Sequence, residues 1–126
     1  MKLTLNHVQR LNLHALLGAQ RVDVGSIRMI WAIQDRIALD ADEEKAIELK
    51  REMAGGQERV VWNSRFSLSA KEFEFADLEV ARIRTTLQAW DSYAAGRDRH
   101  WLEPFVDLLF PTEIPMLAPK QKAATS

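Results

Sequence analysis

Two histidines near the N-terminus, His7 and His14, are the first residues of this 126-residue chain that suggest metal binding. They are seven positions apart, so in a helix they lie near one face but about 10 Å apart along the axis. One ion cannot bridge that distance unaided, and of the histidines only His100 remains as a further ligand for zinc. We therefore expect exposed helix histidines, with no metal site and no cofactor.

An acidic cluster is the second candidate for chemistry, because it resembles the start of a calcium-binding loop. The sequence LDADEEKA places Asp40, Asp42, Glu43 and Glu44 close together. It lacks the glycine at the sixth position and the carboxylate at the twelfth that close an EF-hand loop. A helix start is the better interpretation, with Asp40 as N-cap and the other three acids in the first turn.

The residues that enzymes need are missing from the sequence pattern. There is no cysteine to act as a thiolate, and no serine lies in a nucleophile-elbow context. The pair Gly55-Gly56 is not followed by a helix carrying Lys and Ser or Thr, so it is not a phosphate-binding loop. We expect no catalytic residues and no enzyme activity, although carboxylates distant in sequence could still meet in space.

Composition limits the remaining classes. The length predicts one domain that buries on the order of two thirds of its unfolded surface. The net charge of -1 gives no general attraction to nucleic acid or to an anionic membrane surface. The N-terminal stretch is interrupted by polar residues, so it predicts neither a signal peptide nor a membrane span. We expect a cytoplasmic protein.

The stretch from Asp77 to Tyr93 predicts the helix around which the rest of the chain is organised. Its apolar residues recur every three or four positions, which is typical of one helix face; they are Val80, Ile83, Leu87 and Trp90. Asp77 is the expected N-cap, and Thr86 is expected on the solvent side. Trp31, Trp62 and Trp90 are expected to meet in the core.

Helices are also predicted in the first third of the chain. Apolar spacing predicts a helix from Leu3 to Ala19, with Thr4 or Asn6 as its cap. Asp23 should cap a second helix, which packs on the first as a hairpin. Its broad apolar surface comprises Val24, Ile27, Ile30, Trp31, Ile33 and Ile37. A short third helix follows Asp40.

At Ile47 the sequence pattern changes from the three-to-four-residue spacing of a helix to the two-residue alternation of a strand. Residues 47–53 alternate, Gly55-Gly56 supplies a turn, and residues 59–62 return, so a β-hairpin is predicted. The alternative is that the third helix continues to Met53, since Lys, Glu and Met favour helices. Residues 71–75 predict a third strand with Phe73 and Phe75 on one face. The expected fold is α+β and mostly helical, with about five helices and a small antiparallel three-strand element.

The segment WLEPFVDLLF near the C-terminus is rich in apolar residues. Pro104 fits the first position of a final helix. Such a peripheral helix cannot easily bury all of its apolar side chains, so we predict a docking surface for a partner or a second copy. The predicted partner-binding residues are Trp101, Phe105, Leu109 and Phe110. The alternative is that this segment closes the core. Residues 1–114 are expected to form a single globular domain, and residues 115–126 a flexible tail.

Three helices followed by a hairpin is also the order of many winged-helix DNA-binding domains. However, residues 40–58 hold seven carboxylates against Lys45, Lys50 and Arg51. A recognition helix should instead carry basic and amide side chains towards phosphates and base edges. A small DNA-binding regulator therefore stands as the alternative, and nucleic acid is the less favoured partner.

The layout as a whole resembles small proteins encoded by bacteriophages and prophages. The resemblance depends on LTLNHVQRLNLHALLGAQ, LDADEE, VVWN and the FEF stretch that leads into an amphipathic helix. It covers most of residues 3–93 and implies a partner of a larger phage or host machine. The function expected from this sequence is a non-catalytic protein-interaction module, acting in particle assembly or in interference with a host process.

Overall fold

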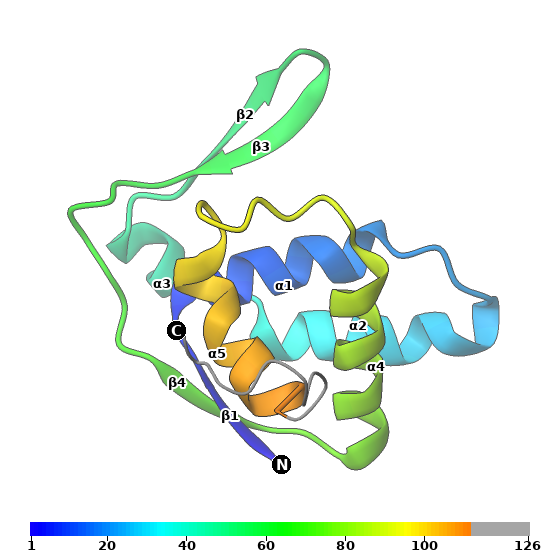
Figure 1. Cartoon of the computed structure of the whole chain (residues 1–126). Coiled ribbons are helices and arrows are strands. Elements are labelled where there is room, and N and C mark those ends of the chain that lie inside the picture. Colours follow the sequence, from blue (N-terminus) through cyan, green and yellow to red (C-terminus); the bar gives the residue numbers. More distant parts are fainter. Residues whose placement is uncertain (112–126) are drawn as a thin grey trace. The chain divides into compact units, whose positions relative to one another are not determined.

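The structure is a computed structural model that describes residues 1–111, so the predicted tail at residues 115–126 lies outside the described residues. The chain divides into two compact units, Met1–Ser92 and Tyr93–Ser126. The predicted fold class is confirmed: the described residues form five helices and two small antiparallel sheets (Figure 1).

The first unit contains four helices and all the strands of the described residues. In chain order they are β1 (Lys2–Leu5), α1 (His7–Ala19), α2 (Val24–Ile37), α3 (Ala41–Ala46), β2 (Lys50–Ala54), β3 (Gln57–Val61), β4 (Lys71–Glu74) and α4 (Asp77–Ala89). The second unit contains α5 (Arg99–Leu109).

The chain begins with a strand, so the prediction of a helix from Leu3 is wrong. Leu3 and Leu5 are buried while Lys2 and Thr4 between them are exposed, which is the two-residue period of a strand. Asn6 ends this strand and caps α1, because its side chain accepts a hydrogen bond from the Gln9 amide. The Gln9 side chain in turn accepts one from the Asn6 amide, at 2.9 Å. This capping box confirms Asn6 as the cap.

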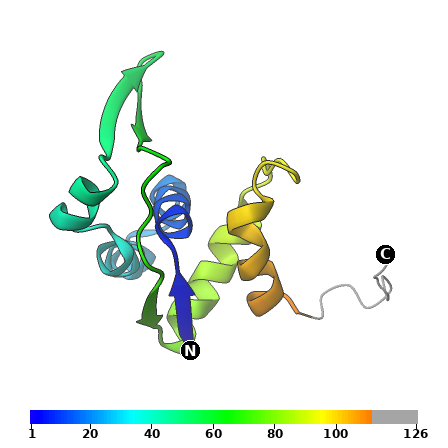
Figure 2. The ribbon, with the colours of Figure 1, turned by 90° about the vertical axis from the view of Figure 1, so that its left-hand side faces the viewer.

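Strand β4 pairs with β1 and does not join the hairpin, so the predicted three-strand element is two separate pairs. The two strands lie side by side (Figure 2), and their register places Leu3 opposite Phe73. Phe73 and Phe75 are both buried, as expected from their alternation, and their rings stack at 6.3 Å. The pair brings the start of the chain beside a segment about 70 residues later.

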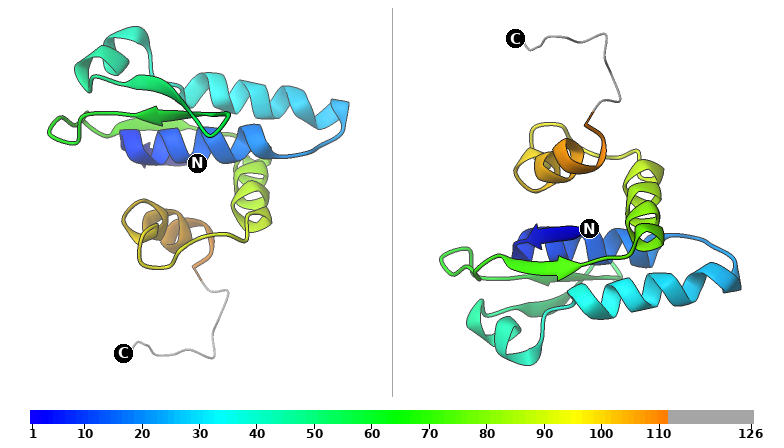
Figure 3. Two further views of the ribbon diagram at one scale, coloured as in Figure 1. Left: turned by 90° about the horizontal axis from the view of Figure 1, so that it is seen from above. Right: turned by 90° about the horizontal axis from the view of Figure 1, so that it is seen from below.

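Helices α1 and α2 pack against each other as the predicted hairpin, and α4 crosses both (Figures 1 and 3). Asp23 caps α2 as predicted, accepting a hydrogen bond from the Ser26 amide at 2.8 Å. The core face of α2 is narrower than predicted, since Val24 and Trp31 are exposed. Its buried residues are Ile30, Ile33 and Ile37.

Helix α4 follows Ala76, which is the N-cap in place of the predicted Asp77. Ile83 and Leu87 are buried as predicted, but the solvent assignment of Thr86 is wrong. Thr86 is 1% exposed, and its hydroxyl donates to the Gln20 side-chain oxygen at 2.6 Å. The helix turns this threonine inward because the segment after α1 lies beside it and offers an acceptor.

The predicted meeting of three tryptophans is also wrong. Trp31 is 56% exposed and Trp90, which follows the end of α4, is 43% exposed. Trp62 is half-buried and contacts the His7 ring edge-on, with the ring centroids 5.7 Å apart. A tryptophan ring is large enough to cover the edge of a small core while part of it stays in solvent.

Helix α5 starts at Arg99, so the prediction that Pro104 starts it is wrong. Asp98 fixes the start: one carboxylate oxygen accepts from the Ala94 amide at 2.8 Å and the other from the Trp101 indole at 3.1 Å. Pro104 is in the helix interior, where it cannot donate to a carbonyl one turn earlier. Trp101 and Phe105 lie on the same face of α5, with their ring centroids 6.4 Å apart.

A buried arginine on α1 joins four elements. Arg10 is 2% exposed; its guanidinium donates to the Ile37 and Ala38 carbonyls at the end of α2, each at 2.9 Å. It also donates to both carboxylate oxygens of Glu43 on α3, at 2.7 and 3.0 Å. The same guanidinium lies 5.3 Å from the centre of the Phe73 ring on β4.

We expect Thr86→Ala to destabilise the protein by about 1 to 3 kcal/mol, because it leaves the Gln20 oxygen without its buried donor. The matched control is Thr85→Ala, since Thr85 is the exposed neighbour whose hydroxyl bonds only the Ala81 carbonyl of its own helix. Urea unfolding of both variants tests the assignment. Equal stability would contradict the inward position of Thr86.

We expect Glu43→Ala to cost about 3 to 5 kcal/mol near neutral pH, because it leaves Arg10 buried without its counter-charge. The Arg10 guanidinium lowers the pKa of Glu43 from 4.5 to about 2. The stability from this depressed pKa is therefore complete above pH 4.5 and is lost as the pH falls towards 2.

Denaturant unfolding at several pH values measures this effect. The Glu43→Ala curve should be flatter than the wild-type curve between pH 4.5 and 2. Asp42→Ala, at an exposed position of the same helix, is the control and should keep the wild-type slope. A wild-type slope in Glu43→Ala would contradict the assignment.

Candidate interaction surface

The β2–β3 hairpin is an arm that extends away from the helices of the first unit (Figures 1 and 2). Its register pairs Lys50 with Val61 and Ala54 with Gln57, which confirms the predicted hairpin and excludes a third helix that continues to Met53. The turn is at Gly55-Gly56, whose φ angles of 60° and 80° favour glycine. All side chains of β2 and those of residues 58–60 are exposed.

The base of the hairpin is firmly attached to the helices. Ile47 is fully buried, and its carbonyl accepts a hydrogen bond from the Asn63 amide at 3.0 Å. The Asn63 side chain donates to Glu48, which has a left-handed φ of 55° at the exit from α3. Arg51 on β2 is paired with Glu44 on α3 at 3.0 Å. The arm is therefore fixed at its base while its faces are left uncovered.

A groove of about 460 Å³ lies between this hairpin and the helices. We call it the hairpin groove. Its walls come from α1, the segment between α2 and α3, α3 itself and the hairpin; the lining residues are Arg10, Leu11, Asn12, His14, Ala15, Ile37, Ala38, Leu39, Glu44, Arg51, Glu58, Arg59, Val60 and Trp62. Its volume is within the range of small binding clefts in proteins.

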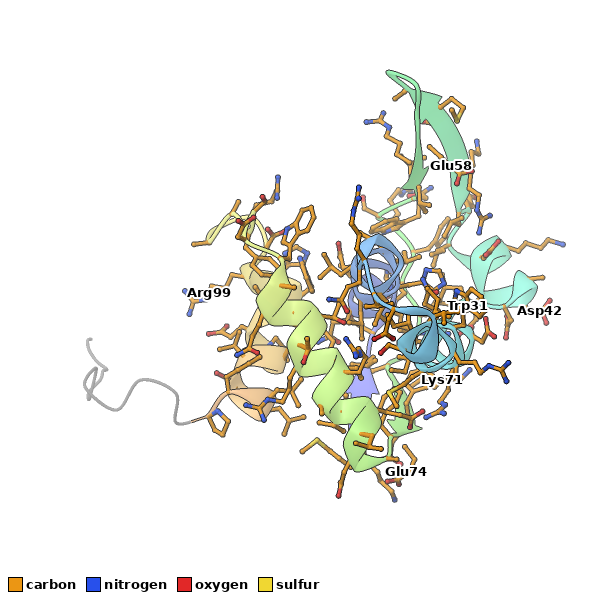
Figure 4. All side chains as sticks on the ribbon, turned by 90° about the vertical axis from the view of Figure 1, so that its right-hand side faces the viewer. Trp31, Asp42, Glu58, Lys71, Glu74 and Arg99 are labelled. Carbon is orange, nitrogen blue, oxygen red and sulfur yellow. The ribbon has the colours of Figure 1, made fainter. Side chains whose placement is uncertain are left out.

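One face of the hairpin forms most of its side of the groove, and Arg59 contributes from the opposite face. Arg51, Met53, Glu58 and Val60 share the first of these faces, because Arg51 pairs with Val60 and Met53 with Glu58 in the antiparallel register. Three of these four residues line the groove, and Met53 continues the face towards the tip. Figure 4 shows Glu58 on the arm. Met53 and Val60 are exposed apolar side chains, at 71% and 37%.

The charges of the groove are largely paired within the chain. Arg10 is held by Glu43, Arg51 by Glu44, and Arg59 by Glu52 at 3.5 Å. The groove is lined by three arginines and by Glu44 and Glu58, so it has no concentration of one sign. Such a lining suits a protein surface with apolar side chains and mixed charges better than a phosphate backbone.

The histidines are not the exposed pair that the sequence predicted. His7 is 6% exposed, and its Nδ1 is buried without a hydrogen-bond partner. Burial lowers the pKa of His7, and the nearby Arg10 lowers it further. His14 is half-buried in the hairpin groove, where burial also lowers its pKa. Both rings therefore favour the neutral form, and the described residues contain no group of three side chains able to hold a metal ion.

The predicted docking residues at the C-terminus have different environments from those expected. Trp101, Phe105 and Leu109 are buried, and Phe110 is half-buried. The apolar side chains of α5 that are most exposed are Val106 and Leu108, at 42% and 46%. A docking role for the four residues stays a prediction.

Sequence reasoning missed the hairpin groove because its lining comes from separate stretches between residues 10 and 62. A signal that could have indicated it is the run of consecutive charged residues at the start of β2, Lys50 to Glu52. A strand with one buried face shows apolar residues at every second position, whereas β2 has Lys50, Glu52 and Ala54 on one face and Arg51 and Met53 on the other. Charged residues on both faces are typical of a hairpin that the core does not cover.

No protein-family model matches this chain, and no match is found among curated proteins or solved structures. None of the helices in residues 1–111 is long and apolar enough to cross a membrane.

We expect replacement of both Gly55 and Gly56 by Ala to loosen the hairpin. A left-handed φ costs about 1 to 2 kcal/mol for each non-glycine residue. The cost comes from the backbone alone, because an added Cβ at either position has nothing within 4 Å. Amide exchange of residues 50–61 should accelerate while thermal unfolding of the helices changes little. Gly96→Ala is the control, since its Cβ is equally unobstructed and its φ is not left-handed. Unchanged exchange in the double variant would contradict the turn.

Proposed function

We propose that this chain is a non-catalytic protein-interaction module that binds its partner through the hairpin groove and the hairpin face beside it. The observation that carries the proposal is the β2–β3 arm, which is fixed at its base although all side chains of β2 and those of residues 58–60 are exposed. A two-stranded hairpin of this kind gains little stability from its own burial. Binding to a partner would account for the exposed side chains of the arm, which folding alone does not explain.

The chemistry of the groove indicates the kind of partner segment that fits. Leu11, Ala15 and Val60 offer apolar contacts, and Arg51 and Glu58 offer charges of both signs. A protein segment with apolar side chains at its centre and polar groups around them matches this lining. The exposed Met53 extends the contact surface towards the tip, and methionine adapts readily to different partner shapes.

The resemblance to small phage and prophage proteins supports a partner in a larger phage or host machine. The module would then act in particle assembly or in interference with a host process. A non-catalytic role agrees with a groove in which the three arginines are paired with carboxylates.

The alternative is a small winged-helix-like DNA-binding regulator, favoured by the order of three helices followed by a hairpin. Two observations weigh against it. Helix α3, which would enter the major groove, has six residues and three acids in its first turn. The basic side chains of the hairpin that would contact phosphates include Arg51 and Arg59, and both are paired with glutamates.

The test compares the wild-type chain with a Met53→Asp/Val60→Asp variant as bait in a bacterial lysate. Both positions are exposed, so the variant should fold. We expect a protein held by the wild type to be lost by this variant, and the purified partner to bind it about tenfold or more weakly by calorimetry.

Leu78→Asp is the matched control, because Leu78 is 72% exposed on α4 and is not part of the groove. It should retain the partner. Equal binding of the partner to wild type and the groove variant would contradict the proposal. A steep loss of affinity for random duplex DNA with rising salt would favour the DNA-binding alternative instead.

A further inference from the structure

Helix α2 has a second face that the fold leaves uncovered. Its core face consists of Ile30, Ile33 and Ile37. The opposite side carries Val24, Arg28, Trp31, Ala32 and Asp35, all of them exposed. At about 100° per residue Val24, Arg28 and Asp35 point almost directly away from the core, and Trp31 and Ala32 flank them. We call these five residues the outer face of α2.

The exposure of this face is unusual for its composition. Trp31, labelled in Figure 4, is 56% exposed, and Val24 is 88% exposed. Tryptophan and arginine are the residue types that most often contribute binding energy at protein interfaces. A solvent-exposed tryptophan at the middle of a 14-residue helix, with an arginine and a valine on the same side, is typical of a helix that packs against another helix.

The charges on the outer face have no partners within the described chain. Arg28 and Asp35 form no hydrogen bond or ion pair within residues 1–111, although the Asp35 charge opposes part of the pKa lowering that burial causes at His14. Neither has an opposite charge three or four positions away on α2, where an intrahelical pair would form. Other arginines of the first unit do form ion pairs; they include Arg10, Arg36, Arg51 and Arg59.

We propose that the outer face of α2 binds the same face of a second copy of this chain, as an antiparallel helix pair with two-fold symmetry. In such a pair each contact occurs twice, so the surface must be complementary to itself. The outer face of α2 meets this requirement, because it carries one positive and one negative side chain at opposite ends and an aromatic ring between them.

The spacing of the two charges fixes the register. When Arg28 of one copy is opposite Asp35 of the other, the two-fold axis passes between the levels of Trp31 and Ala32. The two Trp31 rings then lie next to each other at the axis, offset by about 1.5 Å along the helices. Two Arg28–Asp35 pairs flank the rings, one on each side. Both pairs become less solvated in the dimer, which strengthens them relative to exposed pairs.

This surface is separate from the hairpin groove, because none of its five residues lines that groove. Since each copy contributes one helix, the interface is small, and we expect dissociation in the micromolar range.

Sedimentation velocity of the full chain over a range of micromolar concentrations tests the proposal. The wild type should shift from monomer to dimer as concentration rises. Arg28→Asp puts an aspartate opposite Asp35 at both ends of the interface, and Asp35→Arg puts an arginine opposite Arg28. Like charges then repel at two points, so each variant alone should stay monomeric.

Trp31→Ala removes the rings at the two-fold axis and should weaken association at least about tenfold. Far-UV circular dichroism of this variant and of both charge variants should match the wild type, because all three positions are exposed.

The mixing experiment is the most specific test of the two-fold register. An equimolar mixture of the Arg28→Asp and Asp35→Arg chains should form a heterodimer, since one end of its interface then pairs two wild-type charges and the other pairs the two substituted ones. Opposite charges meet at both ends of this heterodimer only if residue 28 of each chain faces residue 35 of the other chain.

In the mixture, the Arg28→Asp chain keeps Asp35 and the Asp35→Arg chain keeps Arg28, so these two wild-type residues meet across the interface. The double variant Arg28→Asp/Asp35→Arg should dimerise with itself, because each pair is reversed but still opposite in sign. Arg65→Asp, at an exposed arginine outside α2, is the charge-matched control and should dimerise like the wild type.

Three results would overturn the proposal. They are a wild type that is monomeric at all concentrations, single charge variants that dimerise like the wild type, and a mixture that stays monomeric when the wild type dimerises. A variant that loses its helical spectrum would show instead that the substituted residue supports the fold, which also contradicts an outer-face role.

Discussion

The buried ion pair between Arg10 and Glu43 is the interaction on which the first unit depends. Burying a guanidinium is costly unless each of its donors finds an acceptor, and Arg10 has the carbonyls of Ile37 and Ala38 as well as the Glu43 carboxylate. Glu43 also accepts from the Asp40 amide at the start of α3. One side-chain pair therefore sets where α2 ends, where α3 begins and how both lie against α1. The hairpin groove is built directly on this junction.

A second arginine, Arg36, forms a similar ion pair with a glutamate where α2 contacts α4. Arg36 donates to both oxygens of Glu79 and to the Glu74 carbonyl, and it lies 5.2 Å from the centre of the Phe75 ring. Glu79, like Glu43, is the third residue of its helix and accepts from its own N-cap amide. Each glutamate thus caps a helix and holds an arginine from elsewhere in the chain. The two pairs place α3 and α4 relative to α1, α2 and β4 with polar contacts that tolerate little change in geometry.

The two surfaces proposed for binding are the parts of the first unit that these interactions leave open. The hairpin is held at Ile47, Asn63 and Arg51 and is exposed beyond them. The outer face of α2 is exposed because the helix packs into the core through its opposite face, with Ile30, Ile33 and Ile37. A chain of this size has more apolar and charged side chains than its core needs, and those in excess gather where a partner can cover them.

The sequence by itself determined the local structure. Asn6, Asp23 and Asp40 begin helices because their side chains accept from amides within the next three residues, and Gly55-Gly56 makes a turn because glycine alone adopts its φ angles readily. The tertiary structure decided strand pairing and side-chain burial, because both depend on residues that are distant in sequence. Strand β1 exists because β4 supplies its hydrogen bonds, and Thr86 points inward because Gln20 offers an acceptor. The groove and the outer face of α2 became visible only once packing had divided the apolar residues between core and surface. Periodicity shows that a helix has an apolar face, but its buried width depends on which elements pack against it.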